Sequence, residues 1–249
     1  MRVLVVGGAG TVGRMVVPAL AARHQVRVMD LMPSEGVEDF RRGSVTSAED
    51  VAAAAEGQDA LVYLAMGRKD GWRDGPDWVA SHFAVNVTGL YVTLQACARA
   101  GVRLAVHASS MSVFDDYDTR DYAQRPEPDA VDAYGLTKRL GETVCAAAAR
   151  EHGMTVTALR LVGPMPDDEW LACSGPRSEV MTAASDVAAA FVAALERPVQ
   201  GYSAYTITGD HERRFLDWTP AYEDLGWEPL VRRVEPPVDG RPAAVDVED

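Results

Sequence analysis

Short apolar runs alternate with amphipathic segments along most of the chain. The first run, Val3 to Val6, is rich in β-branched residues, as a strand buried on both faces would be. Met15 to Ala22 follows as a helix with its apolar residues on one stripe, and Val26 to Met29 is a second strand. The same alternation predicts helices at residues 48–56, 78–100, 134–150, 185–196 and 219–225, and strands at 60–65, 104–107, 155–161 and 203–208. The pattern therefore predicts an α/β fold, a doubly wound parallel sheet with helices on both faces.

Polar segments interrupt this alternation and suggest how the chain is divided. Residues 32–43, 68–76 and 115–132 are predicted loops, and from Asp167 onward the pattern loosens. Ser185 or Asp186 is expected to cap the helix that begins there. We expect a core at 1–164, a small cap at 165–230 interleaved with the last core helix and strand, and an acidic, Pro-rich tail at 231–249 that is loosely held.

A glycine-rich turn follows the first strand. Gly8, Gly10 and Gly13 have the G-x-G-x-x-G spacing, and Gly7, Gly10 and Gly13 fit a looser G-x-x-G-x-x-G. Glycines let the backbone approach a diphosphate, and the helix that follows offers unpaired N–H groups and partial positive charge. Asp30 ends the second strand, about 20 residues on, where a carboxylate would accept both ribose hydroxyl protons. Strand, turn, helix, strand and acid predict dinucleotide binding.

The same acid bears on which dinucleotide is bound. The carboxylate of Asp30 would repel a 2′-phosphate. Arg41 and Arg42 lie in the following loop and could serve as 2′-phosphate ligands, which leaves NADP as the alternative. We expect NAD as the cofactor, with NADP less favoured.

Composition limits the partners. Hydrophobic residues make up 47% and charged residues 24% of the 249 positions, as in a soluble globular protein. A formal net charge of −13 and a pI near 4.8 argue against nucleic acid or an anionic membrane as partner. No apolar run approaches the roughly 18 residues of a membrane span, and no signal peptide precedes the first strand. Cys97, Cys145 and Cys173 lack metal-ligand spacing, so we expect reduced thiols, no metal and a cytoplasmic protein.

The central catalytic motif is Tyr134-Gly-Leu-Thr-Lys138. Positions i and i+4 share a helix face, so Lys138 would stand one turn from Tyr134. A free phenol has a pKa near 10, and a neighbouring ammonium lowers it toward the range of a working base. Ser110, directly after a neighbouring strand, can donate a hydrogen bond to a substrate oxygen. The three side chains predict proton transfer from a hydroxyl coupled to hydride transfer to a nicotinamide.

These motifs together resemble an extended short-chain dehydrogenase/reductase of the NAD-dependent epimerase/dehydratase family. The matching segments lie at residues 7–13, 30, 64–65, 86–89, 108–114, 134–138 and 225–229, and the match is good as far as about residue 164. The resemblance implies a Rossmann-type core and a small C-terminal substrate-binding cap. It also implies that Tyr134 is the acid/base, that Lys138 is its partner, and that Ser110 rather than Ser109 binds the substrate hydroxyl.

The resemblance extends to the cofactor site. Asn86 would belong to the surroundings of the cofactor and the proton relay, or would instead make a helix-to-loop hydrogen bond. The implied cofactor-binding set is Gly7, Gly10, Thr11, Val12, Gly13, Asp30, Leu64, Ala65, Asn86, Tyr134, Lys138 and Pro164. Helices 78–100 and 134–150 pair with their copies in many relatives, which implies a homodimer; a stripe of Leu136, Leu140 and Val144 is either core or interface.

Two departures from the family pattern bear on the reaction. Sugar-nucleotide dehydratases carry an Asp-Glu pair after the catalytic Ser or Thr, where this chain has Met111 and Ser112. The segment between Pro164 and Ser185 is also short, where relatives acting on nucleotide sugars have a long insertion. We therefore expect an NAD-dependent oxidoreductase acting on a small polyhydroxylated substrate, such as a sugar or uronic acid. Arg68, Arg160 and Arg177 could pair with a substrate anion or be structural.

Other functions stay open from the sequence. One alternative is an epimerase of a sugar or nucleotide sugar, and another is a ketoreductase of a natural-product pathway. A non-catalytic NAD-sensing protein is less favoured, because such proteins often lose the Tyr or the Lys that this chain retains at positions 134 and 138.

Overall fold

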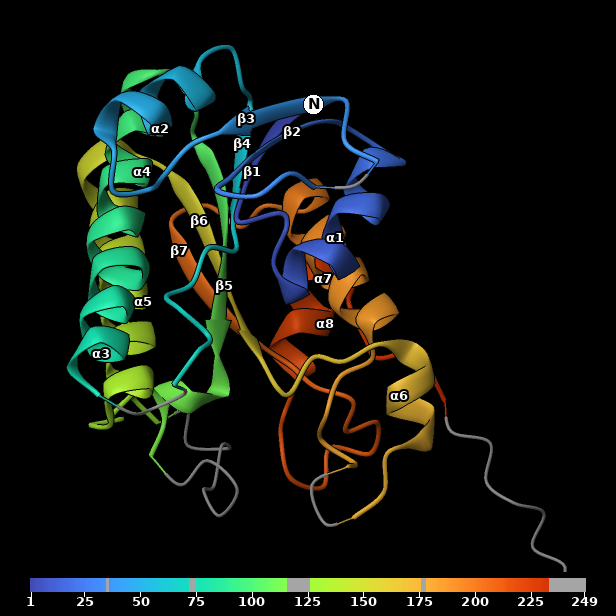
Figure 1. The fold of residues 1–249 in the computed structure, drawn as a ribbon. Coiled ribbons are helices and arrows are strands. Elements are labelled where there is room, and N and C mark those ends of the chain that lie inside the picture. Colours follow the sequence, from blue (N-terminus) through green and yellow to red (C-terminus); the bar gives the residue numbers. More distant parts are fainter. Residues whose placement is uncertain (35, 72–74, 116–125, 176–177, 233–249) are drawn as a thin grey trace, which may run out of the picture.

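A single seven-stranded parallel sheet organises the computed structural model (Figure 1), which describes residues 1–34, 36–71, 75–115, 126–175 and 178–232. The strand order is β3-β2-β1-β4-β5-β6-β7, and every pairing is parallel. The strands are β1 (Arg2–Val6), β2 (Gln25–Asp30), β3 (Asp39–Arg42), β4 (Ala60–Tyr63), β5 (Leu104–Ser110), β6 (Thr155–Leu161) and β7 (Tyr202–Ile207). This doubly wound sheet confirms the predicted fold class.

Helices cover both faces of the sheet (Figure 1). One layer holds α2 (Ala48–Ala55), α4 (Leu90–Arg99) and α5 (Ala133–His152), and the other holds α1 (Thr11–Ala21), α7 (Ala184–Glu196) and α8 (Thr219–Leu225). Alternate residues of each inner strand enter opposite cores. Val3 and Val5 pack toward α1 and α7, whereas Leu4 and Val6 pack toward α2 and α4. Burial on both faces explains why these strands are continuous apolar runs.

The predicted helix at 78–100 is one continuous helical stretch with an irregular middle. It comprises α3 (Pro76–His82), a π-helical segment (Phe83–Gly89) and α4, and it ends before Gly101, whose φ is +86°. A π-helical turn widens the backbone and rotates the side chains that it carries relative to a regular helix. Asn86 lies in this segment.

Two elements were missed by the sequence pattern. The segment 32–43 was predicted to be a loop, but it contains β3, an edge strand of 4 residues whose two arginines are exposed. With so few residues and no buried side chain, the strand has no apolar alternation to detect. The second is α6 (Asp167–Ala172), a short helix with one buried residue, Trp170.

The predicted cap of α7 is wrong. The N-cap residue is Ala183, which makes no side-chain cap bond. The backbone N–H and the hydroxyl of Ser185 both bond to Asp167. The carboxylate of Asp186 accepts from the backbone N–H groups of Leu230 and Val231. Both side chains therefore tie α7 to neighbouring segments instead of capping it.

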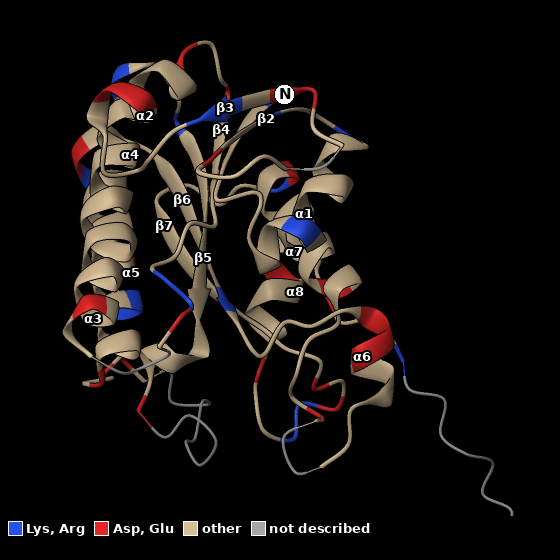
Figure 2. Ribbon diagram, in the orientation of Figure 1, with Lys and Arg blue, Asp and Glu red and all other residues tan. Residues whose placement is uncertain are grey.

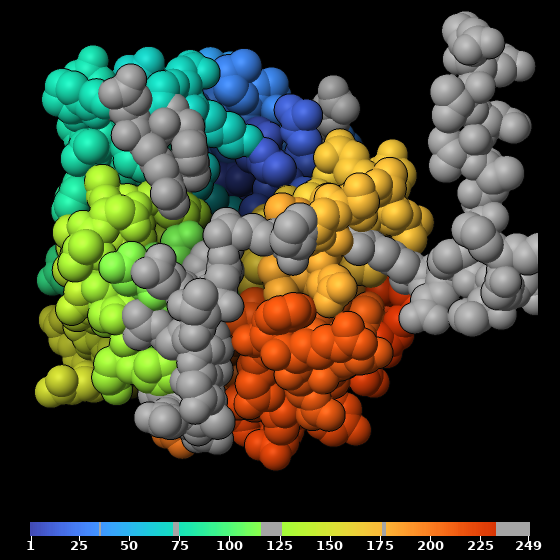
Figure 3. Space-filling view, turned by 90° about the horizontal axis from the view of Figure 1, so that it is seen from below, coloured from blue at the N-terminus to red at the C-terminus, as the bar shows by residue number. Residues whose placement is uncertain are grey.

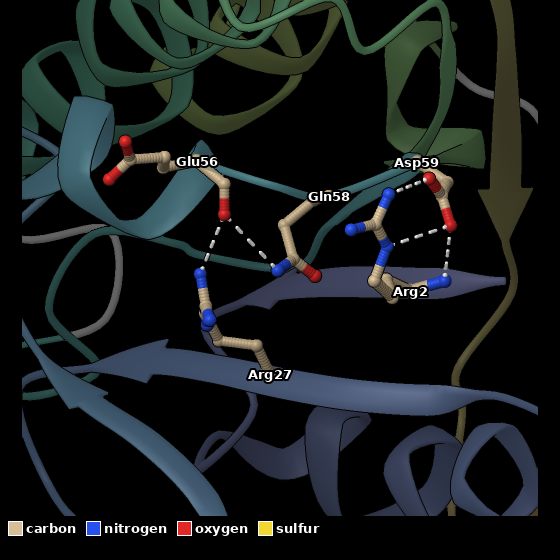
Figure 4. A network of polar contacts seen from close by, with 5 residues as sticks. All are labelled: Arg2, Arg27, Glu56, Gln58 and Asp59. Atoms are coloured by element: carbon tan, nitrogen blue, oxygen red, sulfur yellow. Dashed lines mark hydrogen bonds and ion pairs between the residues drawn. The ribbon is translucent and has the colours of Figure 1, made fainter.

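Polar contacts close the amino edge of the sheet, away from the glycine turn (Figure 4). Arg2 pairs with Asp59, at 2.6 Å, and Arg27 donates to the carbonyl of Glu56 at 2.9 Å. Elsewhere the charged residues lie mainly on helices and loops, and the central strands carry few of them (Figure 2). The glycine turn and the predicted catalytic residues lie at the opposite, carboxyl edge of the sheet, which Figure 3 views from below.

Two expectations from composition can be compared with the structure. Across the described residues, no helix has both the length and the hydropathy that a membrane crossing requires. Cys97 and Cys145 are buried, Cys173 is half-buried, and all three are free thiols. The predicted division into a core at 1–164, a cap at 165–230 and a tail stays a prediction, and residues 233–249 of that tail lie outside the described residues.

Candidate functional site

The glycine turn joins β1 to α1 at the carboxyl edge. Gly7 has φ +87°, and a Cβ there would lie 2.4 Å from the backbone nitrogen of Ala65. A Cβ on Gly13 would lie 2.2 Å from the carbonyl oxygen of Gly8. Gly10 differs, since it is exposed and its Cβ would approach only Gly7 O, at 3.3 Å. Two of these glycines therefore permit packing of the protein on itself, and Gly10 alone faces open space.

Asp30 lies beside this turn, as its place at the end of β2 predicted. One carboxylate oxygen accepts from the backbone N–H of Ala9 at 2.9 Å, and the other accepts from Met32 N–H at 3.2 Å. Each oxygen of a carboxylate can accept more than one hydrogen bond. The two backbone bonds fix the carboxylate against the turn and leave acceptor capacity for a ribose.

Lys69 was not identified from the sequence. It lies in the loop after β4, and its ammonium contacts the hydroxyl of Thr11, the first residue of α1. Both side chains are exposed at the N-terminus of that helix, where free N–H groups and the helix dipole favour an anion. The only sequence signal was a lysine a few residues beyond a strand end, which is too common to single out.

Tyr134 and Lys138 lie in the first turns of α5. Asp132 begins this helix by accepting from the N–H groups of Tyr134 and Gly135, at 3.1 and 3.3 Å. The Lys138 ammonium lies 5.9 Å from the centre of the Tyr134 ring and donates to the carbonyl oxygen of Ala108 at 2.8 Å. Burial lowers the pKa of Lys138 to about 8. The predicted pair is thus brought together, with the cation fixed to β5.

Ser110 is the last residue of β5, so the strand runs beyond the predicted end at His107. Its hydroxyl oxygen accepts from Ser112 N–H at 3.1 Å and begins a short 3-10 turn, Met111–Val113. A Cβ on Gly135 would lie 2.2 Å from Ser112 O. The glycine after Tyr134 therefore lets α5 begin in direct contact with the turn that carries Ser110.

Ser109 has a different environment from its neighbour. Its hydroxyl is buried and donates to Glu142 at 2.7 Å. Glu142 also receives two hydrogen bonds from Arg160, at 2.9 and 2.7 Å. These contacts support the structural interpretation of both Ser109 and Arg160. The guanidinium of Arg160 is engaged by Glu142 inside the protein.

Asn86 makes a helix-to-loop hydrogen bond, which was the second of the two roles predicted for it. Its carbonyl oxygen accepts from Gly67 N–H at 3.2 Å, and its amide donates to the Thr137 hydroxyl at 3.0 Å. The side chain is buried, and Thr137 in turn donates to the carbonyl of Tyr134 at 2.8 Å. Asn86 thus links the loop after β4 to the first turn of α5, and its contact with a cofactor stays a prediction.

An aromatic pair also lies against Tyr134 and was missed in the sequence. His82 stacks on Trp78 with ring centroids 3.7 Å apart, and its ring centroid lies 6.1 Å from that of Tyr134 in a T-shaped arrangement. Burial lowers the pKa of His82, so a neutral ring packs beside the phenol at neutral pH. Histidine on a helix of mixed polarity gives no sequence signal of this contact.

The remaining predicted residues are placed as follows. Val12 is half-buried in the first turn of α1, Leu64 is buried after β4, and Pro164 is half-buried after β6. Arg68 is exposed in the loop that carries Lys69, and Arg177 lies outside the described residues.

Comparison with known proteins identifies the same family that the sequence motifs resemble. Residues 3–165 match the family model described as NAD dependent epimerase/dehydratase family. An L-arabinose 1-dehydrogenase (NAD(P)(+)) of Haloferax volcanii is 33% identical over 184 residues, which are 68% of this chain and 69% of that protein. A 3 beta-hydroxysteroid dehydrogenase/Delta 5-->4-isomerase of Mycobacterium tuberculosis is 34% identical over 176 residues, 65% of this chain and 46% of that one. The chain therefore spans only about half the length of some relatives.

Solved structures show the same fold. A short-chain dehydrogenase/reductase superfamily protein from Agrobacterium tumefaciens with bound NAD superposes with a TM-score of 0.78 at 22% identity, covering 92% of this chain and 93% of that one. A mutated uronate dehydrogenase gives 0.75 at 22% identity, covering 92% and 81%. The family model covers well over half of the chain. In the structure, the glycine turn, Asp30 and the start of α5 all lie at the carboxyl edge of the sheet. The chain belongs to the NAD-dependent epimerase/dehydratase family and is an NAD-dependent enzyme with a Rossmann core.

Proposed function

We propose that the protein is a dehydrogenase that exchanges hydride with a hydroxyl-bearing or keto carbon of a small polyhydroxylated substrate, sugar-like or uronic-acid-like. The observation that carries this proposal is the fixed ammonium of Lys138, buried beside the Tyr134 ring and bonded to β5 two residues before Ser110. A buried cation held one turn from a phenol favours the phenolate, which is the form that accepts a proton.

The cofactor fits the glycine turn by the chemistry of its donors. The N-terminal N–H groups of α1, the open face of Gly10 and the ammonium of Lys69 would receive the diphosphate. Asp30 would accept from the adenosine ribose, and Lys138 would hold the nicotinamide ribose. When bound, NAD supplies the hydride acceptor, and the protein's own groups manage the proton.

The chemistry of the side chains defines their roles. Ser110 would hold the substrate oxygen, and Tyr134 would take its proton as hydride leaves. Lys138 would stay charged and stabilise the phenolate. The same groups working in reverse would deliver a proton to a ketone, so reduction uses one site and one set of residues.

The size of the C-terminal segment supports a small substrate. Between β6 and α7 the chain forms only α6 among the described residues, in place of a long insertion. Met111, at the position of the acid found in dehydratases, is buried, so no carboxylate stands there for eliminating water. Relatives described as an L-arabinose 1-dehydrogenase and a uronate dehydrogenase agree with this substrate class.

A homodimer remains part of this proposal. Leu136, Leu140 and Val144 are half-buried, outside the fully buried core of α5, and Tyr91 on the adjacent α4 is 47% exposed. An apolar stripe on two neighbouring helices is suited to contact with a second copy.

Supplying NAD and a panel of sugars, uronic acids and polyols tests the function by the absorbance of the reduced nicotinamide. We expect turnover with one class of substrate. Tyr134→Phe should lower kcat by about 100-fold or more, the range for a general acid/base, while NAD still binds. Tyr222→Phe, on an exposed tyrosine of α8, is the matched control and should keep full activity. Bound NAD with no net turnover on any substrate would instead indicate an epimerase.

A further inference from the structure

The buried network behind Lys138 has a composition that packing alone does not require. Glu142 is 5% exposed and is bonded to Ser109 and, through two hydrogen bonds, to Arg160. Burying an ion pair is often no better for stability than burying apolar side chains of the same volume. A three-element polar network inside the sheet–helix interface therefore invites a functional explanation.

Spacing along α5 places this network in line with the catalytic pair. Tyr134, Lys138 and Glu142 are separated by four residues each, so they lie on one helical stripe. Lys138 bonds to Ala108 O at 2.8 Å, and Glu142 bonds to Ser109 at 2.7 Å, so successive stripe residues contact successive residues of β5. The stripe is thereby fixed in register against the strand that ends in Ser110.

Arg160 anchors the same network to the neighbouring strand. It lies opposite Ser109 in the β5–β6 pairing, and its guanidinium stacks on the Phe114 ring, 4.9 Å from the ring centre. Phe114 follows the turn that begins at Ser110. The network thus joins α5, β5 and β6 next to the end of β5 that carries Ser110.

We propose that Glu142, held by Ser109 and Arg160, is a positioning residue that keeps Lys138 charged and in place beside Tyr134. The proposal rests on the function proposed above. Lys138 is 5% exposed, and three of its titratable neighbours are uncharged at neutral pH, because burial raises the pKa of Cys145 and lowers those of His107 and His82. The groups that face Lys138 or Glu142 are Tyr134, Glu142 and Cys145 on α5, His107 on β5, His82 on α3, Arg160 on β6 and Tyr202 on β7.

Glu142 is the carboxylate among these neighbours, and it lies on the same helix one turn from Lys138. Its charge raises the pKa of Lys138 against the effect of burial. Arg160 offsets the charge of Glu142 from the far side of the carboxylate. Without Glu142, the ammonium would lose its proton at lower pH, and the phenolate of Tyr134 would lose its counter-charge.

The experiment measures the ionisation of Tyr134 directly, by the ultraviolet difference spectrum between each protein and its Tyr134→Phe counterpart across pH. We expect Glu142→Gln to move the phenolate titration upward by about one pH unit, toward that of Lys138→Met. This shift corresponds to about a tenfold lower kcat near neutral pH, with the KM for NAD little changed. Glu151→Gln is the matched control, since it makes the same substitution at an exposed position near the end of the same helix, and its titration should match the wild type.

Thermal unfolding separates this role from a purely structural one. If Glu142→Gln fails to fold because Arg160 is left unpaired, the double variant Glu142→Gln/Arg160→Met keeps a neutral, similarly sized pair, and its titration should shift in the same direction. A folded variant that has lost the acid but keeps the wild-type titration and kcat would overturn the proposal, even if its Tm had fallen. If the wild type turned over no substrate, the proposed function would fail, while the titration would still decide the role of Glu142.

Discussion

The three glycines of the turn should respond differently to a single added methyl group. The structure predicts that Gly10→Ala folds but binds NAD poorly, whereas Gly13→Ala is damaged in its fold. Gly10 has φ −72°, an ordinary value for alanine, and its new methyl would meet only Gly7 O at 3.3 Å. A methyl on Gly13 would overlap three backbone atoms of Gly8, at 2.2, 2.4 and 2.6 Å.

These contacts set the magnitudes. At Gly10, alanine restricts the unfolded chain and so stabilises the folded protein by about 0.4–1 kcal/mol. This gain roughly offsets the cost of the tight contact with Gly7 O, so the unfolding free energy should stay within about 1 kcal/mol of wild type. At Gly13 a backbone atom must move, and the loss should exceed the roughly 1–3 kcal/mol typical of overpacking. Because the methyl of Gly10→Ala occupies the surface that the diphosphate would approach, NAD affinity should fall at least about tenfold, or about 1.4 kcal/mol.

Urea unfolding gives the stability of each variant, and titration calorimetry gives its NAD affinity. The wild type should also gain Tm as NAD is added, and Gly10→Ala should gain much less at the same concentration. Wild-type affinity in Gly10→Ala would refute the assignment of this glycine to the ligand. A large loss of stability there, with Gly13→Ala unaffected, would refute the reading of both positions.

Two further predictions concern a cation and a histidine. Lys69→Gln should weaken NAD binding by about tenfold, which is the loss expected for one charged hydrogen bond to phosphate, and should leave Tm unchanged. The control is Arg68→Gln, which removes the neighbouring exposed cation. Equal NAD affinities for the two variants would contradict a role for Lys69. For His107, burial holds the pKa well below its usual value, so the unfolded chain binds the proton first as pH falls below about 6.5 and stability is lost in that range. His107→Gln should therefore reduce the slope of unfolding free energy against pH, between about pH 6.5 and 5, by up to about 1.4 kcal/mol per pH unit. Urea unfolding at a series of pH values measures this slope. An unchanged slope would contradict the conclusion that His107 is neutral in the folded protein.

Most of the fold could be predicted because the inner strands are buried on both faces. Such strands are apolar runs, and their alternation with helices leaves few topologies. The elements that were missed lack this signal. At the edge of the sheet, β3 has no buried side chain, and α6 buries only Trp170. Their positions follow from pairing with β2 and from contacts with distant segments, which a local pattern does not contain.

The site was predicted where chemistry depends on local spacing. Tyr134 and Lys138 are four residues apart, so helix geometry alone brings them together. Asp30 and the glycine turn are joined by the two strands that flank one helix. By contrast, Arg160 was a candidate for substrate contact until the structure placed it on Glu142 at 2.7 Å, and Asn86 was found bonded to Gly67 and Thr137. Those partners lie on other elements, so sequence spacing does not relate them.

The overall charge of the chain and the contacts of a bound cofactor act over different distances. The chain carries a formal charge of −13, yet the cofactor that it binds is itself an anion through its diphosphate. At physiological ionic strength, exposed charges more than about 8 Å away are largely screened. The N–H groups of α1 and the ammonium of Lys69 would act at contact distance, where screening is weak. A net negative charge therefore argues against large polyanions that must touch many residues at once, but it does not prevent a small anion from binding at one helix N-terminus.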